Sequence, residues 1–432
     1  MMPVQHELVR LLHGRVAEQM TLAQREDARN NRPPMAPDIE REFARSLINA
    51  ELKAYNEERA AAGIPRMALA DEAELADAVH AQIYGAGALQ PLLEDRNVEN
   101  IDIQGDRTFV TYAGGVRKRL PAVAESDEDL ITLVQGLAAT AGLSSRSWDL
   151  ANPQLDLTWD GVRVSAVLGV TKRPSISIRL ARLGKVFLDD LVRFGSLTDE
   201  AASFLRAAVL ARKNIMIAGA TDSGKTTMLR ALANVIPPEE RLITVERALE
   251  LGLDEFEDLH PNVVVMEERL PNSEGLGAVS MAELVKRSLR QNPDRVIVGE
   301  VLGDEIVTML NAMSQGNDGS LSTIHCRSSS EVFNRIATYA RQAEEKLDRE
   351  TSNMLIGGAL EFVVYLGKVK NPQTGLKERK LISIREVNGV DGAVLSSEVF
   401  RRNQYGELKP SAVITCLDEL AEHGYYPSGD FE

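Results

Sequence analysis

The sequence NIMIAGATDSGKTTMLRA, residues 214–231, constrains the fold of this chain more than any other stretch. An apolar run over 215–218 predicts a buried strand, and a helical pattern follows from Thr227 onward. Between them stands the pattern G-x-x-x-x-G-K-[ST], formed by Gly219, Ala220, Thr221, Asp222, Ser223, Gly224, Lys225 and Thr226. A strand, this loop and a helix in this order predict a phosphate-binding loop for a nucleoside triphosphate.

The chemistry of phosphate binding explains the residue types in the loop. Backbone N–H groups of a glycine-containing loop surround phosphate oxygens, and the N-terminus of the next helix adds a partial positive charge. Lys225 is expected to bind the β- and γ-phosphates, Thr226 to ligate Mg²⁺, and Thr227 to complete the phosphate-binding residues. A glycine-rich turn without a ligand is the alternative, and the flanking strand and helix count against it.

Length, composition and net charge limit the number of domains and the kinds of ligand that this chain is expected to bind. A chain of 432 residues is long enough for two or three domains, because single cores stop growing at roughly 250 to 300 residues. Its hydrophobic content of 44% and charged content of 26% are typical of soluble proteins. The net charge of −15 argues against binding nucleic acid mainly through its phosphates, since that interaction needs a basic field.

Cysteine content and hydropathy bear on the cellular compartment. With only Cys326 and Cys416, the chain has no basis for a disulfide framework or a cysteine-based metal site, which indicates a reducing compartment. The N-terminus lacks the apolar core of a signal peptide, and charged residues interrupt the longest apolar stretches. We therefore expect no segment that spans a bilayer, and a role at a membrane would need a partner that holds the protein there.

The pattern along the chain divides it into four parts. Residues 1–68 carry apolar residues at helical spacing and predict a helical N-terminal extension, with Asp38 as the N-cap of its second helix. Residues 69–183 begin with a helical pattern and continue with short strands and one more helix, which predicts a small α+β domain. Residues 184–197 are punctuated by glycine and aspartate and are predicted to be a linker, and 198–432 form the last domain.

In the last domain, apolar strands alternate with helical patterns, which predicts an α/β fold with a parallel sheet and crossover helices. The expected strands cover residues 214–218, 241–245, 262–267, 295–299 and 321–324. From residue 357 the pattern changes to an antiparallel finish of hairpins, with strands expected at 362–366, 379–387 and 393–400.

Polar residues at the ends of these strands are candidates for the chemistry of hydrolysis. Glu300 ends the apolar run RVIVGE, which is the Walker B arrangement, and Glu246 follows the strand LITV, with Glu250 as an alternative four residues later. His325 follows the strand LSTI, although a lone histidine is often a hydrogen-bonded core residue. The candidates for neutralising phosphate charge are Arg179, Arg269 and Arg290, against the alternative of ordinary surface ion pairs.

The phosphate-binding loop and the three strand ends follow one another in an order that resembles the secretion ATPase superfamily. In that family the loop would be Walker A, and the other segments would be the Asp box with Glu246, Walker B with Glu300 and the His box with His325. Three further stretches are similar to the CpaF-type ATPases of tight-adherence (Flp) pili. Residues 84–93 resemble the element GxGPLxPLL, 175–179 the T-I-R strand, and 281–295 the run M-x-x-L-V-x-x-x-L-R-x-x-P-D-R. The chain is thus identified as a member of the type II/IV secretion ATPase superfamily over about residues 70–370.

The resemblance implies a RecA-like P-loop NTPase domain, an N-terminal α+β (PAS-like) regulatory domain and a flexible linker between them. It further implies a cytoplasmic homo-hexamer, peripheral to the inner face of the cytoplasmic membrane and bound to an inner-membrane platform protein. Such a protein hydrolyses ATP with Mg²⁺ to power pilus assembly or type II/IV secretion, and direct contact with nucleic acid is not expected.

The resemblance also implies roles for the candidate residues. Glu246 would activate water, Glu300 would be the Walker B acid that holds the metal together with Thr226, and His325 would couple the sheet to the phosphate. Arginines of this family act partly across domain or subunit boundaries. On that basis Arg179 would reach the nucleotide from the N-terminal domain, and the other candidates would be Arg269 and Arg290.

Some positions depart from the family pattern. Asp222 stands where the family has glycine, and its carboxylate is expected to oppose phosphate binding, although aspartate tolerates left-handed backbone. Arg247 replaces an aspartate, Leu302 replaces an arginine, and Cys326-Arg327 replace Ala-Asn after the histidine.

Two other functions therefore stay open. The departures at Asp222, Arg247 and Leu302 motivate a nucleotide-binding subunit with little turnover. A RecA-type nucleic-acid translocase is the second alternative. The acidic charge and the aromatic content of 5% count against it, because strand binding uses basic grooves with stacking rings.

Overall fold

The computed structural model describes the chain except residues 1–2, 31–34, 36, 85, 113–114, 141–147, 160–161, 181–183, 272–274, 372–374, 376, 404–405 and 428–432. The chain forms two compact units, Met1–Arg182 and Leu183–Glu432, and each is described by itself. None of the helices within the described ranges is long and apolar enough to cross a membrane.

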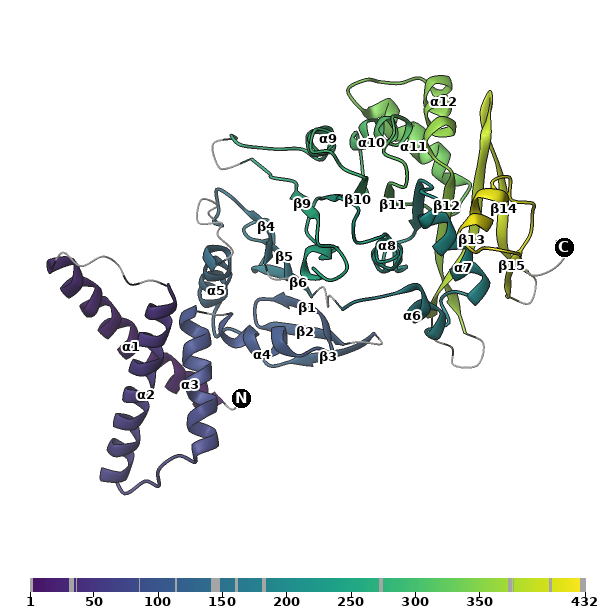
Figure 1. Ribbon diagram of the computed structural model, residues 1–432. Coiled ribbons are helices and arrows are strands. Elements are labelled where there is room, and N and C mark those ends of the chain that lie inside the picture. Colours follow the sequence, from purple (N-terminus) through teal and green to yellow (C-terminus); the bar gives the residue numbers. More distant parts are fainter. Residues whose placement is uncertain are drawn as a thin grey trace. The chain divides into compact units, whose positions relative to one another are not determined.

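Three helices open the first unit (Figure 1): α1 (Pro3–Arg29), α2 (Pro37–Ala61) and α3 (Leu69–Tyr84). Apolar residues of all three, such as Leu12, Ile48 and Val79, form a small core of their own. The second helix begins at Pro37, because the fixed backbone angle of proline suits the first helical position. Asp38 therefore lies inside the helix, and its prediction as the N-cap was wrong.

A six-stranded antiparallel sheet follows in the first unit, with the order β3-β2-β1-β6-β5-β4. Every second side chain of its inner strands is buried, and Ile101 and Ile178 pack against Leu130 and Val134 of the helix α5. The predicted strands and helix are confirmed in number and order. The elements are η1 (Gly87–Leu89), α4 (Gln90–Glu94), β1 (Val98–Gln104), β2 (Arg107–Tyr112), β3 (Val116–Leu120), α5 (Asp127–Thr140), β4 (Gln154–Trp159), β5 (Val162–Val167) and β6 (Ser175–Leu180).

The second unit is built on a nine-stranded sheet with the order β15-β14-β13-β12-β7-β11-β10-β8-β9. The strands from β12 to β9 are parallel, and those from β12 to β15 pair antiparallel. The bounds are β7 (Ile215–Gly219), β8 (Leu242–Glu246), β9 (Val263–Glu267), β10 (Arg295–Val301), β11 (Leu321–His325), β12 (Phe362–Lys370), β13 (Lys377–Asp391), β14 (Ala393–Arg402) and β15 (Leu408–Pro410).

Strand β12 differs from the prediction in one respect. It forms the expected antiparallel pair with β13, but its other edge continues the parallel sheet beside β7. The reason lies in its apolar run, since Phe362 and Val364 enter one core while Val363 enters the other. A strand buried on both faces belongs inside a sheet covered by helices on both sides.

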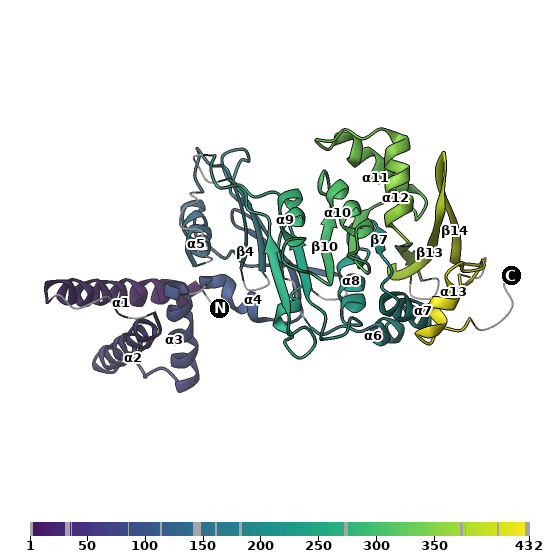
Figure 2. The same cartoon turned by 45° about the horizontal axis from the view of Figure 1, so that its top comes forward.

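Helices cover both faces of this sheet. In β7, Ile215 and Ile217 point into the core on one face, and Met216 and Ala218 point into the core on the other. Figure 2 shows α6, α7, α8 and α13 on one side and α9 to α12 on the other. The bounds are α6 (Leu188–Arg193), α7 (Asp199–Leu210), α8 (Lys225–Ala233), η2 (Leu253–Glu255), α9 (Met281–Ser288), α10 (Glu305–Ser314), α11 (Glu331–Gln342), α12 (Arg349–Ala359) and α13 (Leu417–Glu422).

The segment predicted as a linker, 184–197, is packed as part of the second unit. Leu188 and Leu191 of α6 are buried in its core. Side chains of α8 also bind the backbone of this segment, since Arg230 donates to the Gly184 carbonyl at 2.7 Å and Asn234 to the Val186 carbonyl at 2.8 Å. The segment is therefore held against the helix that follows the phosphate-binding loop.

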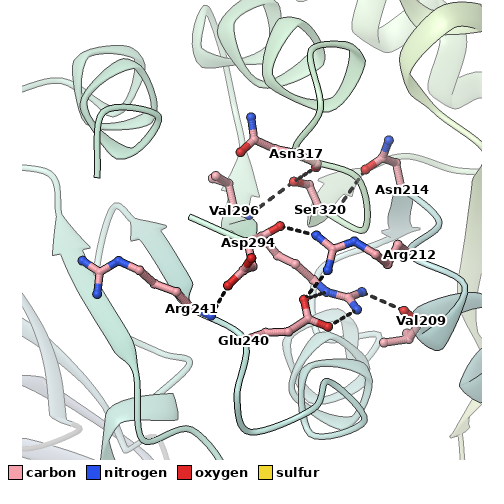
Figure 3. Close-up of polar contacts among 10 residues, drawn as sticks. Val209, Arg212, Asn214, Glu240, Arg241, Asp294, Val296, Asn317 and Ser320 are labelled. Carbon is pink, nitrogen blue, oxygen red and sulfur yellow. Dashed lines mark hydrogen bonds and ion pairs between the residues drawn. The ribbon is translucent and has the colours of Figure 1, made fainter. Parts of the chain in front are cut away.

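A polar network lies at the amino ends of the parallel strands (Figure 3). The guanidinium of Arg295 is buried at the start of β10, donates twice to Glu240 at 2.8 Å and donates once to the Val209 carbonyl at 2.7 Å. Arg212 donates to the same carboxylate at 2.6 Å and to the Asp294 carbonyl at 2.6 Å. Burial acts to raise the pKa of Glu240, but Arg295 and Arg212 outweigh it and lower that pKa below its usual value.

Candidate functional site

The carboxyl ends of four neighbouring strands carry the polar residues predicted from the sequence. The loop 219–226 follows β7, His325 ends β11, Glu300 lies near the end of β10, and Glu246 ends β8. Strand β11 lies between β7 and β10, so the strand order places the histidine between the loop and the Walker B strand. In open α/β sheets this edge is where ligands bind.

The backbone of the loop has the conformation that the motif requires. Gly224 has φ +93° and Asp222 has φ +59°, so both lie in the left-handed region. A Cβ atom on Gly219 would lie 2.7 Å from the Leu366 carbonyl oxygen of β12, which leaves room only for glycine. Asp222 thus adopts the left-handed backbone that aspartate was expected to tolerate.

The loop also fits a phosphate group. The N-cap residue of α8, Gly224, has no side chain with which to cap the first turn, which begins at Lys225. The Ser223 hydroxyl is buried and has no hydrogen-bond partner among the described residues. Because a buried polar group without a partner costs free energy, a bound phosphate oxygen at this helix N-terminus would be stabilising.

Lys225, Glu300 and His325 meet above this loop. The Lys225 ammonium is 3.8 Å from Glu300 Oε1, and His325 Nε2 is 2.7 Å from the same oxygen. The ammonium also lies 3.3 Å and 3.4 Å from the two ring nitrogens of His325 and 3.4 Å from the Ala220 carbonyl oxygen. A cation from the first residue of α8, a carboxylate from β10 and an imidazole from β11 therefore form one contact group.

Glu246 ends β8, the strand next to β10, and its two carboxylate oxygens have different surroundings. Its Oε2 accepts hydrogen bonds from the backbone N–H groups of Glu250 at 2.8 Å and Leu251 at 3.0 Å, whereas Oε1 has no partner among the described residues. Burial raises the pKa of Glu246 to about 7, although the two backbone bonds oppose this. A Cβ on Gly299 would lie 3.0 Å from Glu246 Cγ, so glycine at this position lets Glu246 lie against the Walker B strand.

The residues predicted to hold a metal are Thr226, the second residue of α8, and Glu300. Within the described ranges, no group of three histidine, cysteine, aspartate or glutamate side chains is arranged to hold a metal ion. Mg²⁺ is usually bound through one or two protein oxygens, with waters and substrate phosphates completing the shell. Thr226 and Glu300 suit that mode of binding, and their role stays a prediction.

Known proteins share this arrangement of sequence and fold. The family model described as type II/IV secretion system protein matches residues 154–364. A Mycobacterium tuberculosis protein, provisionally described as a conjugal transfer protein, is 31% identical over 334 residues, which are 75% of this chain and 90% of that protein. This chain belongs to the type II/IV secretion system protein family.

A further relative and a solved structure are also similar to this chain. VirB11 of Agrobacterium fabrum is 36% identical over 164 residues, which cover 38% of this chain and 46% of VirB11. The X-ray structure of the Legionella pneumophila ATPase DotB has the same fold, with a TM-score of 0.51 and 21% identity over 69% of this chain and 79% of DotB. The predicted superfamily and α/β fold are confirmed, and nucleotide binding follows from membership among the secretion ATPases.

The three predicted arginines are all exposed. Arg269 is exposed between β9 and α9 and donates Nε–H to the Gly277 carbonyl at 2.5 Å, and Arg290 is exposed just after α9. Neither takes part in the hydrogen bonds and ion pairs described here around Lys225. Arg179 is exposed on β6 of the first unit, in register with Asn100 and Arg163. Roles for the three arginines stay predictions of the family resemblance.

Two residues that depart from the family pattern, Arg247 and Leu302, form ion pairs or hydrogen bonds with nearby residues. Arg247 pairs with Glu268 at 2.9 Å, and the backbone N–H groups of Leu302 and Gly303 donate to the buried Glu305 carboxylate at 2.5 Å and 3.1 Å. Sequence reasoning missed Glu305, which fixes the turn after the Walker B strand and starts α10. The signal was present, because an acid in the first turn of a helix accepts such bonds.

Proposed function

We propose that this protein is a cytoplasmic ATPase that hydrolyses ATP to drive pilus assembly, as in the CpaF-type branch, or type II/IV secretion. One observation carries the proposal: the ammonium of the phosphate-binding loop, the Glu300 carboxylate and the His325 imidazole lie within 3.8 Å of one another. Family membership supports a secretion ATPase, and the stretches at 84–93, 175–179 and 281–295 support the tight-adherence branch.

Each residue of the site has its own role in the proposed hydrolysis. Lys225 and the loop backbone bind the phosphates, and Thr226 and Glu300 would hold Mg²⁺, which would supply positive charge to the phosphate oxygens. Glu246 orients the attacking water through Oε1, the oxygen that has no partner among the described residues, and a pKa of about 7 lets this carboxylate accept a proton near neutral pH. His325 bonds to Glu300 and lies beside Lys225, so it links β11 to both groups.

The proposed assembly is a homo-hexamer at the inner face of the cytoplasmic membrane, bound to an inner-membrane platform protein. The family resemblance supports this assembly, and it gives exposed Arg179, Arg269 and Arg290 a role at a nucleotide shared between domains or subunits. No direct contact with nucleic acid is included, because the chain carries a net charge of −15.

Steady-state phosphate release from the purified full chain tests hydrolysis. We expect Lys225→Ala and Glu300→Gln to reduce the rate to background, while Glu300→Gln keeps ATP binding. The matched controls are Arg206→Ala and Asp189→Asn, which remove one charge each from an exposed ion pair elsewhere in the second unit and should leave the rate unchanged. Equal rates in the wild type and both site variants would leave only a nucleotide-binding subunit.

Two further measurements test the rest of the proposal. Size determination with ATP and Mg²⁺ should show a ring-sized oligomer, and a persistent monomer would contradict the proposed assembly. Phosphate release should not respond to DNA, since stimulation by DNA would favour the nucleic-acid translocase instead.

A further inference from the structure

Asp222 is one member of a group of three charged residues. Lys368 of β12 and Arg379 of β13 face each other directly in the antiparallel ladder. Like charges at directly opposite positions destabilise a strand pair. The Asp222 carboxylate binds both cations, since Oδ2 lies 2.7 Å from Lys368 Nζ and Oδ1 accepts a hydrogen bond from the Arg379 guanidinium. We name Asp222, Lys368 and Arg379 the loop clamp.

The loop clamp also contacts the backbone of the phosphate-binding loop. Arg379 Nε donates to the Asp222 carbonyl at 3.2 Å, and its Cδ would lie 3.5 Å from a Cβ atom on Gly224. Asp222 has φ +59°, a conformation that costs free energy for any residue except glycine and needs support from its surroundings. The strands β12 and β13 supply that support from outside the loop.

Charge explains why the clamp matters for a nucleotide. Burial acts to raise the pKa of Asp222, but the Lys368 hydrogen bond and the Arg379 charge outweigh it and lower that pKa, so the carboxylate is ionised at neutral pH. An ionised carboxylate in a phosphate-binding loop repels a triphosphate unless cations neutralise it. The sequence predicted that the Asp222 carboxylate would oppose phosphate binding. In the structure, Lys368 and Arg379 offset its charge.

We propose that Lys368 and Arg379 are positioning residues for the nucleotide: they neutralise Asp222 and hold the phosphate-binding loop in its binding conformation. The inference rests on the proposed nucleotide site, and it explains how a loop with aspartate in place of glycine accepts a triphosphate. All three residues belong to the second unit, so the clamp acts within one chain.

The test is an equilibrium titration of the full chain with a fluorescent ATP analogue and Mg²⁺. The variants are Lys368→Gln/Arg379→Gln, Asp222→Asn, and the triple variant that combines all three substitutions. We expect the double variant to raise Kd about tenfold, a modest effect because the three charged side chains are partly exposed and solvent screens them. Asp222→Asn and the triple variant should both stay within about threefold of the wild type, because no charge then needs neutralising.

The sheet itself offers a matched control. Arg401 of β14 and Lys409 of β15 form another directly opposite pair of cations, away from the loop. Arg401→Gln/Lys409→Gln should leave Kd unchanged. Amide exchange in the nucleotide-free protein gives a second readout, because residues 219–224 should exchange faster in Lys368→Gln/Arg379→Gln and not in the control.

The outcomes separate this inference from the proposed function. A wild type that binds the analogue without hydrolysing ATP would overturn the proposed ATPase and leave the clamp testable. Unchanged Kd and exchange in Lys368→Gln/Arg379→Gln would overturn the clamp alone. Equal weakening in the double and triple variants would show that the two cations bind phosphate directly, which contradicts neutralisation of Asp222.

Discussion

His325 Nε2 lies 2.7 Å from Glu300 Oε1, and this contact joins two neighbouring strands at the edge that carries the phosphate-binding loop. The Thr323 hydroxyl, on the same strand as the histidine, donates to the Gly299 carbonyl at 2.8 Å and fixes β11 against β10. The imidazole also lies beside the Lys225 ammonium. One side chain therefore touches both charged groups on which the proposed hydrolysis depends.

His325→Ala should lower kcat for ATP hydrolysis while changing ATP affinity little. The loop keeps its backbone and Lys225, but Glu300 loses the partner that orients it, and misplaced catalytic groups reduce rates by about 100-fold. Steady-state phosphate release gives kcat, and a binding titration gives Kd. The matched control is His423→Ala, which removes an exposed histidine near the C-terminus. A fall in affinity as large as the fall in kcat would make His325 a binding residue instead.

The rate of hydrolysis should rise with pH through about 7, because the pKa of Glu246 is raised to about 7 and its ionised form is the proton acceptor. Glu246→Gln should remove this rise and lower kcat by about 100-fold or more, as expected for loss of a general base. A pH–rate profile of both proteins measures the effect. A wild-type rate that stays flat between about pH 6 and 8 would exclude Glu246 as the base.

The Glu246 carboxylate should also make the stability of the folded protein depend on pH. The rate of hydrolysis rises with pH, whereas this contribution to stability falls. Because its pKa is raised above the ordinary value of 4.5, the folded protein binds this proton more tightly than the unfolded chain does. That stabilisation is complete below the ordinary value and is lost as pH rises to about 7. The glutamine in Glu246→Gln does not ionise. The melting temperature of this variant minus that of the wild type should therefore be more positive above about pH 7 than near pH 5.

The sequence predicts much of this fold for a simple physical reason. Strands of a parallel sheet are buried on both faces, so they appear as short, nearly continuous apolar runs that end at polar residues. The runs before Glu246, Glu300 and His325 are of this kind, and the structure places all three at strand ends on one edge.

Tertiary packing determines the strand order, the long-range ion pairs and the packing of the segment 184–197, which the sequence does not predict. The position of β11 between β7 and β10 depends on which strands pair, and no local pattern encodes that order. Asp222 meets Lys368 and Arg379 across 146 and 157 residues, so its departure from the family pattern has no visible partner in the sequence. The segment 184–197 has the glycines of a linker, yet its leucines pack into the second core.

Removing the guanidinium of Arg295 should destabilise the second unit without changing the nucleotide site. Arg295→Met removes the bidentate partner of the mostly buried Glu240 carboxylate, and because Arg212 still pairs with this carboxylate, the loss should be about 1–3 kcal/mol. Both tryptophans, Trp148 and Trp159, lie in the first unit, so their fluorescence does not report this loss. Chemical denaturation followed by circular dichroism, with amide exchange of β10, measures it in the second unit.

A paired variant separates the charge effect from the loss of packing. Glu240→Met/Arg295→Met removes both charges while keeping side-chain volume, and it should recover most of the stability lost in Arg295→Met, because an apolar pair replaces a buried ion pair at little cost. Arg212 then keeps its bond to the Asp294 carbonyl. A double variant as unstable as the single one would contradict the electrostatic account. ATP affinity of the folded protein should stay at the wild-type value in both variants, since the network lies at the amino ends of the parallel strands, whereas Lys225 follows the carboxyl end of β7.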